Sequence, residues 1–360
     1  MLSTVIISET VTVGFEADSL VARLVEQARR KMLEKAATRG AFGLMALSLA
    51  ACKSEDGSSL TVGSGQSVSG QVLKGPLQGA FVFADLNDDG IFNVGEPNAT
   101  TVADGSYTLT GVGNSGYSVI ATTSSTTIDG STGLVLDNVT LKTTAGSTVI
   151  SPITTLIEET GLSAAAVATA LGVPDGVDLL SFNPYANGVD AAAALSIEKL
   201  SQQIVATMRG VAAAAEGAGL TSAAAADLAI KAVADVVMTN ASTAGSVTLN
   251  FSDAATITTI VDAAATAAVT AGADQTRMSG VKDAVSSAIS NVNDKISTVT
   301  DLTLTASKAI FAISGTLASE AKAAATEGTA DSITLDEAAN VDAAAIDLED
   351  DVVAAAEAGS

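Results

Sequence analysis

The local pattern of the sequence changes near Thr148, and this change limits the folds open to the chain. Before it, short β-prone runs alternate with clusters of Gly, Asn and Asp; after it, long alanine-rich stretches follow one another. The first pattern is typical of a small β-domain and the second of packed helices. We therefore expect an α+β multidomain chain, with a small antiparallel β-sandwich over 61–147 and an alanine-rich α-helical bundle over 148–360.

Several short runs in the first region have the composition of strands. They are rich in β-branched and aromatic residues and are bounded by Gly, Asn or Asp. At this spacing we expect a sandwich of about six to eight antiparallel strands. The predicted strands are 71–73, 80–84, 106–109, 117–121, 133–136 and 139–142.

The second region carries helix start and stop signals. Apolar residues make up 48% of the chain but aromatic residues only 3%, so alanine must supply most of the surface between closely packed helices. Ser151, Thr221 and Ser252 are predicted N-caps, and Pro152 suits the first helical position. Further helices are predicted over 163–171, 189–217, 221–240, 252–271, 276–298, 303–325 and 335–357, with stops at Gly161, Gly172, Gly219, Gly245, Gly272 and Gly328. The Thr-rich segment 246–250 could pair as a strand instead.

A calcium-binding pattern lies inside the β-prone region. The segment 85–96 fits D-x-[DN]-x-[DN]-G-x5-E without a gap, and calcium takes about six to eight oxygen ligands in flexible geometry. The predicted ligands are Asp85, Asn87, Asp89, the carbonyl of Ile91, Asn93 and Glu96. The alternative is an acidic hairpin turn without a metal, since these residues also favour turns. Because strands flank the segment, we expect a structural calcium site that stiffens the β-module.

The absence of histidine and the presence of one cysteine exclude whole classes of chemistry. Without them there is no Ser-His-Asp or Cys-His arrangement and no ordinary zinc site. The chain has 17 Lys and Arg against 40 Asp and Glu, a net charge of −23, so it repels phosphate backbones. We expect no nucleic-acid partner.

The single cysteine, Cys52, follows a basic stretch and an uncharged apolar run over 41–51. That run has the length of a signal-peptide core and is too short to cross a bilayer. The segment Leu49-Ala50-Ala51-Cys52 resembles the lipobox of bacterial lipoproteins, in which the equivalent cysteine is acylated after cleavage before it. The resemblance implies a membrane partner through a lipid anchor at Cys52 and an extracytoplasmic location. Lys53, rather than Asp, implies onward transport to the outer membrane or cell surface of a Gram-negative bacterium.

The N-terminal organisation follows from this motif. We assign 32–51 to the signal peptide and 52–60 to a flexible polar tether. A lipoprotein signal normally begins the chain, and Met32 would be a more ordinary start. Residues 1–31 are therefore either the product of an upstream start codon or a cytoplasmic extension.

The β-prone region also resembles a known family. Ala80-Phe81-Val82, Gly95-Glu96-Pro97 and Asp104-Gly105-Ser106-Tyr107 match the strand, acidic segment and turn of transthyretin-like sandwiches, including the B-type repeats of bacterial adhesins. The resemblance implies a stalk or presentation role with bound calcium, to which Asp104 could add a ligand. Some relatives carry internal isopeptide bonds, for which Lys74 could be the donor, but the sequence indicates no acceptor and we predict no such bond.

Three functions are compatible with these features. We expect a non-enzymatic surface lipoprotein, structural or adhesive, in which the β-module presents the helical domain. The alternative is an envelope lipoprotein that binds a glycan or protein partner through the helical domain. A carboxylate-dependent hydrolase is the third, and the sequence offers Glu158, Glu159, Glu198 and Glu216 for it without favouring any two.

Overall fold

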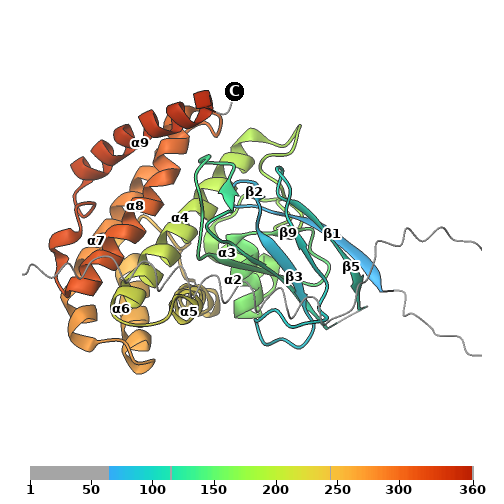
Figure 1. The fold of residues 1–360 in the computed structure, drawn as a ribbon, viewed down its shortest axis with the longest axis horizontal. Coiled ribbons are helices and arrows are strands. Elements are labelled where there is room, and N and C mark those ends of the chain that lie inside the picture. The colour runs from blue at the N-terminus through green and yellow to red at the C-terminus, as the bar shows by residue number, and fades with distance from the viewer. Residues whose placement is uncertain (1–64, 114–115, 244, 359–360) are drawn as a thin grey trace, which may run out of the picture. The chain divides into compact units, whose positions relative to one another are not determined.

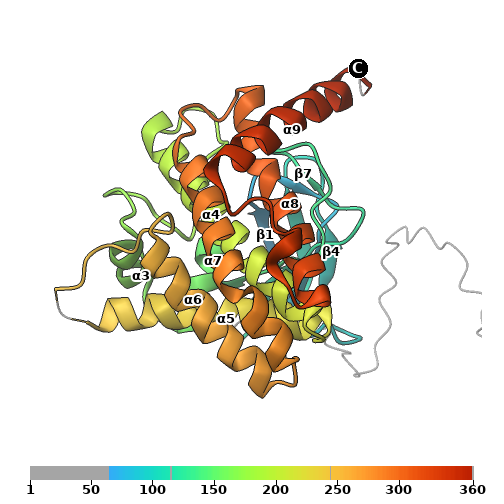
Figure 2. The same cartoon turned by 90° about the vertical axis from the view of Figure 1, so that its left-hand side faces the viewer.

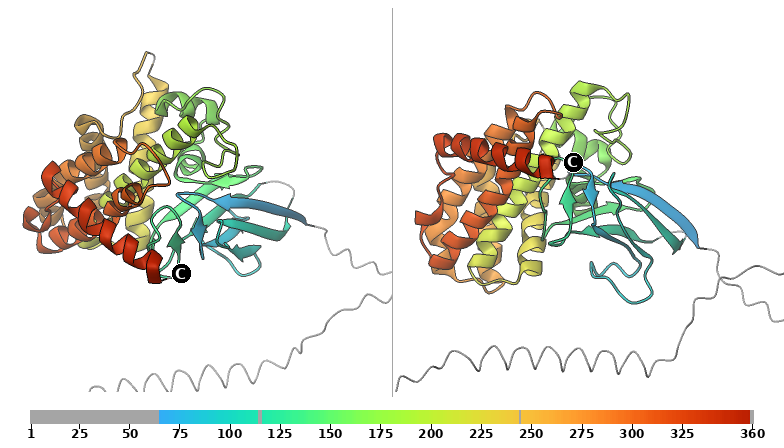
Figure 3. Two further views of the ribbon diagram at one scale, coloured as in Figure 1. Left: turned by 90° about the horizontal axis from the view of Figure 1, so that it is seen from above. Right: turned by 45° about the horizontal axis from the view of Figure 1, so that its top comes forward.

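Strands come first along the chain and helices follow, as Figure 1 shows for the residues that the computed structural model describes, 65–113, 116–243 and 245–358. The prediction of an α+β fold is therefore confirmed. The described strands and helices belong to one compact unit. Figure 3 shows the strands on one side of this unit and the helices on the other.

The strands of the described residues form three sheets. The largest has the order β4-β3-β6-β8, a second has the order β5-β1-β9, and β2 pairs with β7 alone. Their bounds are β1 (Gln66–Val72), β2 (Leu77–Gln78), β3 (Phe81–Asp85), β4 (Asn98–Thr100), β5 (Ser106–Val112), β6 (Ser118–Thr122), β7 (Ile128–Asp129), β8 (Thr140–Thr144) and β9 (Val149–Ile150). Their buried core includes Val72, Leu77, Val82, Leu109, Val119, Leu141 and Ile150.

One pairing corrects the expectation of an antiparallel domain. β1 pairs antiparallel with β5 but parallel with β9, where Gln71 lies opposite Val149 and Val72 opposite Ile150. Parallel neighbours need a long crossover connection, and the chain from β2 to β8 provides it here. The parallel pairing of β9 could not be predicted from the sequence of its two residues, because it depends on residues far away in the chain.

The prediction of a strand over 133–136 is wrong. This segment belongs to a turn, with a single isolated bridge between Ile128 and Val135. Gly133 has a φ of 78°, and its N–H donates to the carbonyl of Asp129 at 2.7 Å. The segment makes two further backbone hydrogen bonds, from the N–H of Asp129 to the carbonyl of Leu134 and from the N–H of Leu136 to the carbonyl of Thr127, both at 2.9 Å, which together with one bridge are too few to form a strand.

Every predicted helix is present, with its ends displaced by no more than three residues. The bounds are α2 (Pro152–Thr160), α3 (Ala164–Leu171), α4 (Ala191–Gly217), α5 (Ser222–Ser242), α6 (Ala254–Thr270), α7 (Gln275–Ser297), α8 (Thr305–Glu327) and α9 (Ala338–Ala358), with a short 3-10 turn at Ala330–Ser332. The segment 246–250 carries no strand. None of the described helices is long and apolar enough to cross a membrane.

Most of the predicted N-cap residues, and three of the predicted stop glycines, cap helices in the structure. Ser151 accepts a hydrogen bond from the N–H of Thr154 in a capping box, and Thr221 accepts one from Ala224, as predicted. Asp253, rather than Ser252, caps α6 because its carboxylate accepts from the N–H of Thr256. Among the predicted stops, Gly161, Gly172 and Gly328 are left-handed C-caps.

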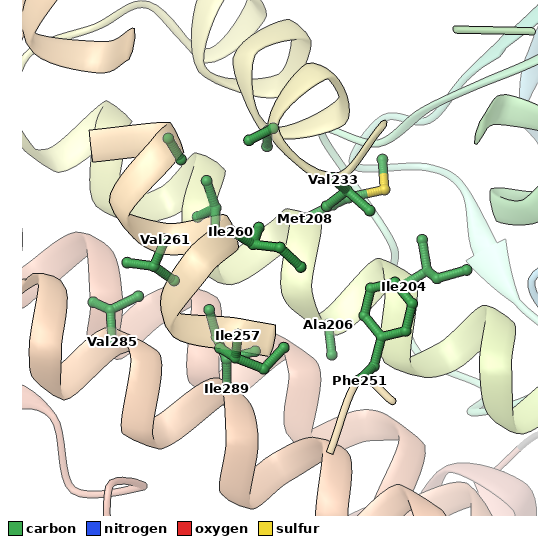
Figure 4. Close-up of a cluster of buried hydrophobic side chains, with 14 of the residues drawn as sticks. Ile204, Ala206, Met208, Val233, Phe251, Ile257, Ile260, Val261, Val285 and Ile289 are labelled. Atoms are coloured by element: carbon green, nitrogen blue, oxygen red, sulfur yellow. The ribbon is translucent and has the colours of Figure 1, made fainter. Parts of the chain in front are cut away.

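The helical core is built around α4, which packs against α5, α7 and α8. Figure 2 shows α4, α7 and α8 side by side. Buried apolar side chains meet there, as in Figure 4, which labels Ile204, Val233, Ile260 and Ile289 from helices and Phe251 from the turn before α6. Glycines bring the backbones closer still. A Cβ on Gly217 would lie 2.4 Å from the carbonyl oxygen of Lys322 in α8, and one on Gly210 would lie 2.9 Å from Ile289 in α7.

The sheets and helices are joined by polar contacts as well as packing. In α2, Thr155 accepts a hydrogen bond from the N–H of Lys142 at 2.9 Å, and Thr154 donates to the carbonyl of Lys142 at 2.9 Å. Beyond α3, Asn183 donates to the side chain of Gln71 at 2.8 Å. Helix α2 therefore supplies hydrogen-bond partners to the backbone of β8, the edge strand of the largest sheet.

Candidate metal centre

The predicted calcium ligands lie in the loop that connects β3 to β4, and Asp85 begins it. Asp85 ends β3 and is only 1% exposed. One carboxylate oxygen accepts from the N–H groups of Asn87 and Asp89, both at 3.3 Å, and the other accepts from the N–H of Gly90 at 2.7 Å. The buried carboxylate thus accepts hydrogen bonds from three backbone N–H groups in the first half of the loop.

Asp89 occupies the middle of the loop and is exposed. Its Oδ1 accepts from the N–H of Ile91 at 2.8 Å, and its Oδ2 accepts from the amides of Asn87 at 2.9 Å and Asn93 at 2.8 Å. These donors, the Ile91 N–H first, lower the pKa of Asp89. Three other predicted ligand residues therefore hold this carboxylate in its ionised form.

Glu96 closes the loop. It is 7% exposed; one oxygen accepts from the N–H of Leu86 at 2.9 Å and the other from the N–H of Asn93 at 2.8 Å. Between these ends, Gly90 has a φ of 74° and its Cβ position is open, so the backbone conformation rather than space requires glycine there. The loop is a closed hydrogen-bonded ring that includes each predicted ligand residue.

The donor set fits a hard cation in its chemistry. It offers three carboxylates, two amides and one backbone carbonyl, all oxygen ligands of the kind calcium prefers. Asn93 also donates to the carbonyl of Ile91 at 2.9 Å, so both amides turn N–H groups toward predicted ligand oxygens. Rotating each side-chain amide by about 180° would put its oxygen where its NH2 group now lies, without changing the shape of the side chain. As it stands, the described part of the chain contains no group of three or more Asp, Glu, His or Cys side chains arranged to hold a metal. Calcium remains a prediction.

A cavity of about 630 Å³ opens beside this loop. The loop forms one wall, β8 a second, and the helices α2 and α5 the others. The charged residues that line it are Asp85, Asp88, Asp89, Lys142, Glu158, Glu159, Asp227 and Lys231. Lys142 pairs with Glu159 at 3.1 Å and Lys231 with Asp227 at 2.8 Å, which leaves the cavity with an excess of negative charge. Sequence analysis missed this grouping because its members come from four separate elements.

Glu158 is a half-buried carboxylate of this cavity. Burial raises the pKa of Glu158, and Asp88 and Glu159 add to the rise while Lys142 opposes it. The folded chain therefore binds the Glu158 proton more tightly than the unfolded chain does. As the pH rises from the ordinary pKa of glutamate through the raised pKa of Glu158, the free energy of unfolding falls.

We expect Glu158→Gln to stabilise the fold at neutral pH, by less than about 1 kcal/mol because the site is half-open to solvent. Well below the ordinary pKa of glutamate the benefit should vanish, since the carboxyl is then protonated in both states. Urea unfolding at the two pH values measures the difference. Glu159→Gln is the matched control, because it removes the partner of Lys142 and should not stabilise. An equal stability of wild type and Glu158→Gln at neutral pH would contradict the argument.

The other predicted residues are dispersed. Cys52 and the lipobox lie outside the described residues. Asp104 caps the turn before β5, where the side chain and N–H of Ser106 lower its pKa. Among the glutamates considered for hydrolysis, Glu216 pairs with Lys322 at 2.6 Å on the surface. Glu198 is buried in a separate cluster, away from Glu158 and Glu159 in the cavity.

Comparison of the chain with protein-family models, with curated proteins and with solved structures gives no match.

Proposed function

We propose that this chain is a non-enzymatic lipoprotein of the bacterial cell surface with a structural or adhesive role. Its β-module, a sandwich of the transthyretin-like or Ig-like type, binds calcium and presents the helical domain. The observation that carries the proposal is the loop from Asp85 to Glu96, in which each predicted ligand residue is already tied to another by hydrogen bonds. Both ends of the loop continue into paired strands.

Calcium would act as a structural ion in this arrangement. The loop holds the carboxylates of Asp85, Asp88, Asp89 and Glu96 with no lysine or arginine among them. A divalent cation would offset their mutual repulsion and fix the connection between β3 and β4. It would also fix one wall of the cavity shared with α2 and α5.

The lipid anchor would hold the protein at the membrane. Several acyl chains on one cysteine give nearly irreversible attachment, whereas a single chain does not. The tether over 52–60 would then separate the β-module from the bilayer. This part of the proposal rests on the sequence around Cys52.

Palmitate labelling tests the anchor. In bacteria that express the full chain, we expect labelled protein in the membrane fraction, and we expect Cys52→Ala to lose both the label and the membrane association. Ser54→Ala, two positions along, should retain both. Labelling that persists in Cys52→Ala would contradict anchoring at this residue.

The second candidate is a ligand-binding envelope lipoprotein for a glycan or protein, and the acidic cavity favours it. Helices contribute four of the eight charged residues that line it, Glu158, Glu159, Asp227 and Lys231. A partner captured from envelope extracts by the wild type, but not by Asp227→Lys, would favour this candidate over a purely structural role.

A further inference from the structure

A second cavity, of about 500 Å³, lies beside the first half of α4. Its walls are the end of α3, the end of α7, the loop 248–252 and the face of α4 that carries Leu195, Lys199 and Gln203. Its volume is in the range of small-molecule sites, about 300–1,000 Å³. None of the described residues that line it is an aspartate or a glutamate, although the chain has 40 of them. In charge, this cavity is therefore the opposite of the acidic cavity beside the loop from β3 to β4.

The loop 248–252 is fixed by hydrogen bonds to helices on two sides. The N–H of Leu249 donates to the carbonyl of Ala170 in α3 at 2.8 Å. The side-chain amide of Asn293 in α7 donates to the carbonyl of Phe251 at 2.8 Å. The loop wall is therefore held in place by the helical scaffold, and the cavity is preformed, as ligand sites usually are.

Lys199 gives the cavity a positive charge. Its Nζ donates to the carbonyl of Ser297 at 2.6 Å and to that of Val299 at 3.2 Å, where α7 ends. Carbonyls at a helix end attract an ammonium group but carry no full charge. Lys199 makes no ion pair with any carboxylate of the described residues. Because an ammonium group has three N–H donors, one donor and an unbalanced charge are left for a ligand.

Gln203 gives the cavity an unpaired acceptor. The side chain is 9% exposed, and its Nε2 donates to the hydroxyl of Ser252 at 3.0 Å and to the backbone carbonyl of Asn293 at 2.9 Å. A carbonyl only accepts, so this contact fixes which end of the amide is the nitrogen. The Oε1 of Gln203 accepts no hydrogen bond from the described residues and, unlike Oδ1 of Asn293, is not sealed from solvent. A ligand that displaces water from this oxygen must bring a donor, since an unpaired buried acceptor is costly.

Three leucines form an apolar wall between these polar groups. Leu195 and Leu200 of α4 and Leu249 of the loop are half-buried and pack against the helical core. All three line the cavity, so the exposed parts of their side chains face it. A hydrocarbon chain that covered them would be removed from water together with the leucine surface.

We propose that this cavity binds a hydroxylated carboxylic acid with a hydrocarbon chain. The carboxylate accepts from Nζ of Lys199, the hydroxyl donates to Oε1 of Gln203, and the hydrocarbon covers the leucines. Lys199 and Gln203 are four positions apart on α4 and so lie side by side on one face, which suits two polar groups close together on one chain. One lysine matches a singly charged head, whereas a doubly charged phosphate would add to a net charge of −23. This site is independent of the calcium loop and of the lipid anchor.

Calorimetric titration tests the proposal. The full chain with Cys52→Ala is the protein, because it can be purified without a detergent that would compete for the cavity. The probes are octanoate and 3-hydroxyoctanoate at concentrations below those at which they form micelles. We expect each to bind once per chain, and 3-hydroxyoctanoate to bind more tightly by about threefold to tenfold, the effect of one added hydrogen bond.

Two uncharged or oppositely charged analogues show whether the anionic head is recognised. Octanol and octylamine have the same hydrocarbon chain, and we expect both to bind more weakly than octanoate by about tenfold or more. The absence of saturable octanoate binding, or equal affinities for octanoate and octylamine, would overturn the proposal.

Lysine variants test the position of the carboxylate. Lys199→Met keeps the length of the side chain but removes its charge, so it should weaken octanoate binding by about tenfold or more and leave octanol binding unchanged. The control is Lys282→Met on the surface of α7, where Lys282 pairs with Asp262 at 2.7 Å; it should bind octanoate as the wild type does. Wild-type octanoate affinity in Lys199→Met, or an equal loss in both variants, would overturn the proposal.

Two further variants test the hydroxyl contact and the location of the site. Gln203→Met has a thioether that accepts only weakly, so it should bind octanoate but lose the preference for 3-hydroxyoctanoate. Because Gln203 also holds Ser252 and Asn293, a second variant leaves these buried contacts intact. Ala192→Phe fills the cavity from its exposed edge and should weaken the binding of both acids. A preference retained in Gln203→Met with native circular dichroism, or wild-type affinities in Ala192→Phe, would overturn the proposal.

Discussion

Saturating calcium should raise the free energy of unfolding of the full chain by about 2.7 kcal/mol when its free concentration is about a hundred times its Kd. The reason is that the ion binds the folded loop and finds no ordered ligand set in the unfolded chain. Thermal unfolding with calcium and with a chelator measures the effect as a difference in Tm. Magnesium should give a smaller rise, because it prefers octahedral geometry and keeps its waters.

Two neighbouring aspartates give the sharpest control for this experiment. Asp89→Asn removes the central exposed carboxylate of the predicted ligand set and should abolish most of the calcium response. Asp88→Asn removes the adjacent carboxylate, which is no predicted ligand, and asparagine suits its φ of 58°. The Asp88 variant should therefore keep a response close to that of the wild type. Equal calcium responses in the two variants would contradict a site at this loop.

Ile289→Ala should destabilise the chain by about 2–5 kcal/mol, the cost of a cavity in a packed core. Ile289 is completely buried in α7 (Figure 4). Its side chain lies 2.9 Å from where a Cβ on Gly210 of α4 would stand. Urea unfolding measures the loss. Ile346→Ala, on the exposed side of α9, should change stability by less than about 0.5 kcal/mol.

A double-mutant cycle tests whether this contact is as specific as the structure indicates. Gly210→Ala alone places a methyl group 2.9 Å from Ile289 and should destabilise the chain. In the Ile289→Ala background the nearest remaining side chain is Leu317, at an ordinary contact distance of 3.4 Å. The same change then gains helix propensity of about 1 kcal/mol, so it should stabilise. A cost of Gly210→Ala that is equal in both backgrounds would contradict the proposed fit between α4 and α7.

Much of the helical region could be predicted from the sequence because its signals are local. Ser151, Pro152 and Thr221 start helices through hydrogen bonds within one turn, and Gly161 and Gly328 end them through a backbone conformation. The exception is α6, where two adjacent cap residues, Ser252 and Asp253, compete and the sequence cannot choose between them.

The strand pairing and the grouping of side chains could not be predicted in the same way. β9 is two residues long and finds its parallel partner across most of the β-module. The loop from Asp85 to Glu96 is contiguous in the chain, so the sequence alone could predict a calcium site there. By contrast, Lys74 meets Asp129 and the helix that carries Glu198 only after folding, and no spacing in the sequence relates the three residues.

The parallel pairing of β1 and β9 has a mechanical consequence. A pull on the Gln66 end of β1, resisted by the helices that follow β9, acts on opposite ends of two strands that run in the same direction. Such a load slides the strands past each other, so the bonds from Gln71 to Thr148 and from Leu73 to Ile150 are strained together rather than one after another. The junction between sheet and helices is thereby oriented to bear force in shear.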